Sequence, residues 1–169
     1  MSINTVANRG GMKLIRTSIL DEIAFPKDYL SGDRLKVKKL AKPGNLEAII
    51  AARPRPTSLA RFAASTSIGS RAKIGVQVRL KKTSGAVVLK KAWLVNLKNG
   101  NIGLAVRVKS SDLANKYADI KTWLVPDKVA LLYGPSVDQV FRDVSQKTSA
   151  PIGRMVTEEF LRQFTRLTR

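Results

Sequence analysis

The side chains that could do chemistry in this sequence are hydroxyls and carboxylates, because the chain contains no cysteine and no histidine. The commonest general base and metal ligand is therefore missing, together with thiolate nucleophiles. The adjacent carboxylate pairs, Asp21–Glu22 and Glu158–Glu159, have the pattern of solvated helix positions. The serines lack a nucleophile-elbow context. Gly100 and Gly103 lie in a predicted hairpin, so they do not form a phosphate-binding loop before a helix. We predict no enzyme activity, no catalytic residue, no metal site and no cofactor.

The charge of the chain is strongly positive, with 31 Lys and Arg against 12 Asp and Glu, a formal net charge of +19. Such a surplus repels itself in a compact monomer and usually indicates a polyanionic partner, most often nucleic acid. The excess is not confined to a tail, since residues 73–125 hold 11 cations and 2 carboxylates. No uncharged apolar stretch approaches the ~18 residues of a membrane span, and no signal-peptide pattern opens the chain. We expect a protein made in the cytoplasm without a membrane segment.

The organisation of the chain suggests a short arm followed by one domain. Residues 1–11 are polar and end in glycine, which predicts a mobile N-terminal arm. Residues 12–169 are predicted to form a single α+β domain, a central antiparallel β-meander with helices at both ends. Apolar residues recur at helical spacing in Met12, Ile15, Ile19 and Ile23, although a strand is the alternative.

The stretch between this helix and the meander carries two further predictions. Asn45 follows a turn and can cap a short helix bearing Leu46, Ile49 and Ile50. Residues 53–58 are predicted to form a basic linker, because alternating prolines fix an extended path from which Arg53 and Arg55 project. A direct contact of these arginines with phosphate is the alternative.

The predicted meander consists of residues 73–81, 86–95 and 102–109. The first and last segments alternate apolar and polar residues, the second is interrupted by a bulge at Lys90–Lys91, and Asn99–Gly100 is a strong hairpin signal. The meander would have one apolar and one basic face, and the basic face has no aromatic residue on which a base could stack. We therefore expect contacts with a nucleic-acid backbone and no reading of bases. Candidate DNA-facing or interface residues are Arg53, Arg55, Arg79, Lys81, Lys82, Arg107 and Lys109.

The C-terminal part begins with a predicted strand at residues 129–133, a tight turn and an amphipathic helix. Tyr133, Gly134, Pro135 and Ser136 would form the fold-defining turn, with Ser136 as the N-cap and Gln139 completing a capping box. A separate last helix is predicted after Ala150–Pro151 or Gly153. Its apolar stripe, interpreted as core or subunit interface, consists of Ile152, Val156, Phe160, Phe164 and Leu167.

Several stretches, in their order along the chain, resemble the prophage minor tail protein Z family. Leu132-Tyr133-Gly134-Pro135-Ser136-Val137, followed by Phe141, is similar to the LYGPSV…F signature of that family. Residues 51–62, 76–79 and 98–101 resemble other parts of the same pattern. The resemblance covers roughly residues 46–145, and leaves the N-terminal segment and the last predicted helix outside it.

The resemblance implies a structural virion component of a long-tailed bacteriophage, a tail-completion or neck protein where the tail tube meets the head connector. It implies a homo-oligomeric ring, usually sixfold, between tail-tube or tail-terminator proteins and head-connector proteins, with DNA in the lumen. A minor tail protein at the distal tail end is an alternative within the same class. A freestanding, non-specific nucleic-acid-binding protein is the alternative that the charge alone supports.

Overall fold

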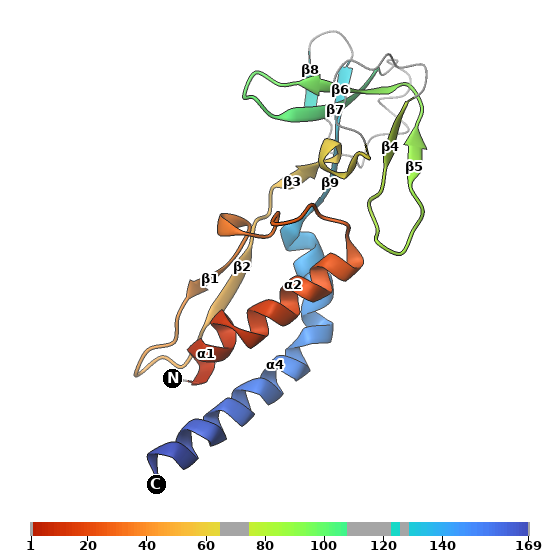
Figure 1. The fold of residues 1–169 in the computed structure, drawn as a ribbon. Coiled ribbons are helices and arrows are strands. Elements are labelled where there is room, and N and C mark those ends of the chain that lie inside the picture. Colours follow the sequence, from red (N-terminus) through yellow and green to blue (C-terminus); the bar gives the residue numbers. More distant parts are fainter. Residues whose placement is uncertain (1, 65–74, 108–122, 126–128, 169) are drawn as a thin grey trace. The chain divides into compact units, whose positions relative to one another are not determined.

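The computed structural model of the chain describes residues 2–64, 75–107, 123–125 and 129–168 (Figure 1). Its helices and antiparallel sheets confirm the predicted α+β class. The chain forms two compact units where the sequence had indicated one domain over residues 12–169. Unit 1 comprises Met1–Glu22, Lys27–Arg55 and Ser136–Arg169, and unit 2 comprises Ile23–Pro26 and Pro56–Pro135.

Unit 1 is built on one long helix, α4 (Val137–Leu167), against which two N-terminal helices, α1 (Ser2–Asn8) and α2 (Gly10–Glu22), pack. The helical spacing of Met12, Ile15 and Ile19 places these side chains in the core, where Ile19 is fully buried. A 3-10 turn, η1 (Gly32–Arg34), leads into a hairpin of β1 (Leu35–Lys39) and β2 (Ile49–Ala52). The two strands are antiparallel, with Leu35 opposite Ala52.

Three predictions in unit 1 are wrong, and the first concerns the N-terminus. Residues 2–8 form α1 instead of an arm, because Val6 and Ala7 are buried and the Asn4 side chain bonds the backbone of Ala41 in both directions, at 2.8 and 2.9 Å. Residues 45–50 form no helix. Asn45 pairs with Lys42 across a two-residue turn, and the pairing of β2 with β1 outweighs the short apolar periodicity.

The third wrong prediction is a break near Pro151, since α4 runs through it as one helix of 31 residues. Proline removes the hydrogen bond that its N–H would give to the carbonyl of Lys147, which usually ends or bends a helix. One turn earlier Thr148 is buried, and its Oγ1 donates to the carbonyl of Val144 at 2.9 Å. Packing of the helix against α1 and α2 holds the regions on both sides of the proline in helical form.

Unit 2 contains a five-stranded sheet and a two-stranded sheet. The larger has the order β3-β9-β7-β6, with β8 also pairing to β9. Its strands are β3 (Pro56–Ser58), β6 (Ala92–Asn96), β7 (Ile102–Arg107), β8 (Trp123–Val125) and β9 (Val129–Ser136). The smaller sheet pairs β4 (Val76–Val78) with β5 (Val87–Leu89), and η2 (Leu59–Phe62) precedes β4. The predicted hairpin at Asn99–Gly100 is confirmed between β6 and β7, with Gly100 at φ 74°.

The predicted three-stranded meander is wrong, because residues 86–95 are two strands of different sheets. Lys90 and Lys91 form a turn, and the positive φ of Lys91, 63°, redirects the chain. The segment before the turn pairs with β4, and the segment after it pairs with β7. Residues 73–74 and 108–109 of the predicted strands lie outside the described residues.

The predicted basic face is wrong for β7, although β4 alternates as predicted, with Val76 and Val78 buried and Gln77 exposed. Both faces of β7 are apolar: Leu104 lies between Leu94 and Leu132 on one face, and Ala105 lies between Trp93 and Leu131 on the other. Leu104 and Ala105 are both 0% exposed. A strand covered on both faces has no solvated side on which to present cations, so β7 exposes a cation only at its end, Arg107.

The segment Tyr133 to Ser136 is the end of a strand and not the predicted tight turn. β9 continues to Ser136, where proline can be accommodated because a strand end has fewer ladder bonds to lose. Gly134 is needed for space, since a Cβ there would lie 3.0 Å from Leu59 Cδ2. The predicted helix start is confirmed: Ser136 Oγ accepts from the N–H of Gln139, and the Gln139 side chain accepts from the N–H of Ser136.

Gly75, which precedes β4, is expected to be intolerant of alanine. Its φ is +80°, and an added Cβ would lie 2.5 Å from the carbonyl oxygen of Leu89. Backbone strain and this clash together should lower the free energy of unfolding by about 2 kcal/mol or more, measured by urea denaturation. Gly85→Ala is the control, because nothing lies within 4 Å of its Cβ position. Equal effects of the two substitutions would contradict the described position of Gly75.

Candidate nucleic-acid interface

The cations of unit 2 are the strongest functional feature of the structure. The described residues of this unit include eight cationic side chains, all exposed, and no carboxylate. They are Arg61, Arg79, Lys81, Lys82, Lys90, Lys91, Lys98 and Arg107. Unit 1 differs, because carboxylates neutralise cations there in ion pairs such as Lys147–Glu22 at 2.8 Å and Lys39–Glu47 at 2.6 Å. The described residues of unit 1 hold 16 cations and 9 carboxylates, so its excess of positive charge is similar to that of unit 2, and only the described part of unit 2 is free of carboxylates.

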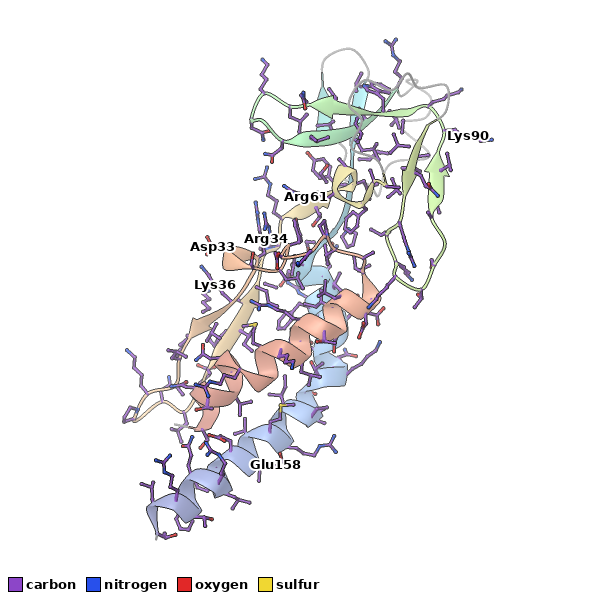
Figure 2. The ribbon with its side chains drawn as sticks, viewed as in Figure 1. Asp33, Arg34, Lys36, Arg61, Lys90 and Glu158 are labelled. Atoms are coloured by element: carbon purple, nitrogen blue, oxygen red, sulfur yellow. The ribbon has the colours of Figure 1, made fainter. Side chains whose placement is uncertain are left out.

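Most of these cations lie in turns or near strand ends, and Arg61 lies in η2. Arg79 and Lys81 follow β4, and the Arg79 Nη2 donates to the carbonyl of Lys82 at 2.7 Å, which holds the two residues together. Lys90 and Lys91 occupy the turn between β5 and β6, and Figure 2 shows the Lys90 side chain directed away from the strands. Side chains at such places are solvated and can reach the phosphates of a backbone without entering a groove.

The structure separates the predicted contact residues into groups. Arg79, Lys81, Lys82 and Arg107 all belong to unit 2 and are exposed, although at strand ends and turns and not on one sheet face. Lys109 lies outside the described residues.

The two arginines of the predicted linker belong to unit 1. Arg55 is exposed, whereas Arg53 is half-buried, and its backbone is held by Arg34 at 2.9 Å and by Asp138 at 3.2 Å. The linker prediction for residues 53–58 is wrong for its second half, which forms β3, with Thr57 1% exposed.

Sequence reasoning missed Arg61, Lys90, Lys91 and Lys98 as contact candidates. The doublet Lys90–Lys91 was a usable signal, since two adjacent lysines cannot both point away from a buried strand. Its interpretation as a bulge kept both residues within one strand, whereas a turn exposes both.

A second surface, at the C-terminal end of α4, is apolar and exposed. Phe160, Leu161 and Phe164 are each 56% exposed and Leu167 is 85% exposed. Together with Ile3, Leu46 and Val156, the two phenylalanines and Leu167 line a groove of about 470 Å³ within unit 1. The lining of this groove contains no charged side chain. We call this surface the α4 patch; of the two interpretations of the predicted stripe, its exposure disfavours core and leaves interface.

A polar network beside the α4 patch joins α1 to α4. Glu159 accepts from Arg162 Nε and Nη2 at 2.8 and 2.7 Å and from Gln163 Nε2 at 2.7 Å. Gln163 Oε1 in turn accepts from Ser2 Oγ at 3.1 Å. The hydrogen bonds from Arg162 and then Gln163 lower the pKa of Glu159 from its usual 4.5 to about 2.

The lowered pKa predicts an acid-dependent loss of stability. Because the folded chain holds the Glu159 proton less tightly than the unfolded chain, this contribution is complete above about pH 4.5 and is lost as the pH falls toward about 2. Glu159→Gln should therefore be less stable than the wild type at pH 6, and the difference should close near pH 2 in urea unfolding. Glu158→Gln, an exposed neighbour on the same helix (Figure 2), is the control. A difference that stays constant from pH 6 to 2 would contradict the assignment.

Within the described ranges, no three acidic side chains gather closely enough to hold a metal ion. No described helix combines the length and apolarity needed to cross a membrane. Comparisons with protein-family models, with curated proteins and with solved structures each found no match.

Proposed function

We propose that this chain is a structural virion protein of a tailed bacteriophage, a tail-completion or neck protein that joins the tail tube to the head connector. In this proposal it forms a ring, sixfold in the family it resembles, around the DNA channel. Neighbouring tail-tube or tail-terminator and head-connector proteins are its partners, and it acts without a cofactor or a catalytic step. The resemblance of residues 46–145 to the minor tail protein Z family is the reason for proposing that the chain belongs to a phage particle.

The observation that carries the proposal is the set of eight exposed cations in unit 2, with no carboxylate among its described residues. A protein beside passing DNA needs attraction to every phosphate and preference for no base. Lysines and arginines on turns provide this, because they neutralise phosphates and release counterions regardless of sequence. Reading of bases requires side chains rigidly placed in a groove, and the turn positions of these cations do not favour it.

The α4 patch supports the assembly part of the proposal, with a second copy of this chain as its occupant. Copies with a charge of +19 repel each other over most of their surface. The groove lining contains no charged side chain, so apolar contact within the groove does not itself bury a cation. A contact of this patch with a different surface of the next copy would be heterologous, which is the kind of interface that closes a ring.

The test of DNA contact is the salt dependence of binding by the full chain to duplexes of random sequence. We expect binding of similar strength to unrelated duplexes, with log K falling linearly with log salt at a slope of about −0.9 per phosphate contact. Strong preference for one sequence, or no binding at low salt, would contradict it.

The same cations favour a second candidate, a freestanding nucleic-acid-binding protein. That candidate predicts a chain that stays monomeric at all concentrations and is absent from particles.

A further inference from the structure

The two-stranded sheet of unit 2 has one occupied and one open side among the described residues. On the side of β4 away from β5, the N–H of Arg79 donates to the carbonyl of Phe62 at 3.0 Å, and the N–H of Ala64 donates to the carbonyl of Gln77 at 2.9 Å. β5 pairs with β4 and with no other described strand. An edge strand of this kind presents unpaired backbone N–H and C=O groups to any extended chain that approaches.

The side chains of β5 make this edge unusual. Val87 is 62% exposed and Val88 is 50% exposed, although Val78, directly opposite Val87, is only 6% exposed. Adjacent residues of a strand point to opposite faces, so an apolar side chain is available on each side of the edge. A strand added to β5 would cover part of both valines and gain apolar contact in addition to ladder hydrogen bonds.

The charges around β5 indicate which kind of segment would bind at this edge. Lys82 precedes the strand and Lys90–Lys91 follows it, all three exposed, and no described residue of unit 2 is acidic. A second copy of β5 would place its own lysines beside these in either strand direction, and the repulsion between like charges disfavours self-pairing. Lysines at the edge of a sheet are known to protect it against aggregation in this way. A segment with carboxylates on both sides of a short apolar stretch would instead meet opposite charges at both ends.

We propose that β5 is a strand-addition site that binds an extended acidic segment of another protein. The segment pairs with the backbone of Val87–Leu89, covers Val87 and Val88, and places carboxylates beside Lys82 and Lys90–Lys91. This inference does not depend on the proposed function, because it requires neither DNA nor assembly of the chain.

The experiment uses the full chain and a synthetic peptide with blocked ends, in which alternating threonine and valine residues lie between two aspartates at each end. We expect binding at low salt, with new protection from hydrogen exchange at the Val88 amide, which faces away from β4, and shifts of the NMR signals of Val87–Leu89. Methylating alternate peptide nitrogens should weaken binding about tenfold or more, because the ladder hydrogen bonds are lost. Replacing the aspartates with asparagine should weaken it by a similar factor.

Variants of the chain complete the test. Lys82→Gln/Lys90→Gln should weaken binding of the aspartate peptide and leave binding of the asparagine peptide unchanged. Lys98→Gln should change neither, since the β6–β7 turn that holds it lies on the other side of unit 2 from β5 (Figure 1). Equal binding of the methylated and unmethylated peptides would overturn the proposal, because attraction would then be by charge alone. Absence of binding at low salt, or protection confined to other amides, would also overturn it.

Discussion

Replacing Arg79, Lys81, Lys82 and Arg107 with glutamine is expected to weaken binding of the full chain to duplex DNA by about a thousandfold at about 0.1 M salt. Each cation that touches a phosphate contributes about 0.9 to the slope of log K against log salt, so four lost contacts should lower the slope by about 3.6. Fluorescence anisotropy with a labelled random duplex, titrated at several salt concentrations, measures both quantities. All four side chains are exposed, and the hydrogen bond from Arg79 to the Lys82 carbonyl is exposed as well, so the substitutions should cost little folding stability.

The matched control for this variant replaces four exposed cations of unit 1, Lys13, Arg16, Lys27 and Arg154, with glutamine. It lowers the net charge by the same amount, so general attraction to DNA falls equally in both variants. We expect the control to keep most of the wild-type affinity and slope. Equal losses in the two variants would contradict the assignment of DNA contact to unit 2 and would leave only the net charge as the cause.

Replacing Phe160 and Phe164 together with serine is expected to reduce self-association of the chain by about a thousandfold. Burial of a phenylalanine side chain contributes about 2 kcal/mol, and two such losses amount to about three powers of ten in an association constant. Sedimentation equilibrium at about 0.5 M salt, where repulsion between the +19 copies is screened, measures the change. Both side chains are 56% exposed in the single chain, so serine should cost little folding stability.

The control for assembly replaces two exposed apolar residues outside the α4 patch, Leu40 and Val88, with serine. Their loss removes similar exposed apolar surface, so non-specific hydrophobic association is reduced in both variants. Self-association of the control should remain close to that of the wild type. A wild-type chain that is monomeric at every concentration, or a control that dissociates as fully as the phenylalanine variant, would contradict the role of the patch.

The features predicted correctly from the sequence depend on contacts between near neighbours in the chain. The capping box of Ser136 and Gln139 spans three residues, and the β6–β7 hairpin needs only the glycine at position 100 to adopt a positive φ. The periodicity of Met12, Ile15 and Ile19 is likewise a property of one helix. Such signals are local and need no knowledge of the rest of the fold.

The features missed depend on pairings between distant segments. Nothing in residues 86–95 says that Val87–Leu89 pairs with β4 while Ala92–Asn96 pairs with β7, because both halves have strand-forming residues. The burial of Ala105 depends on Trp93 and Leu131, which lie beside it in neighbouring strands. The sequence therefore identified several of the exposed basic residues of the candidate interface. It placed them wrongly on one face of a sheet, whereas they lie in turns and near strand ends.

The position of this protein in purified phage particles tests the central proposal most directly. Mass spectrometry of the particles would establish its presence, and cryo-electron microscopy would locate it. The proposal predicts a ring between the head connector and the first tail-tube ring, with the cations of unit 2 toward the DNA. Density at the distal tail tip would contradict the joining role, and absence of the protein from the particles would contradict a structural role altogether.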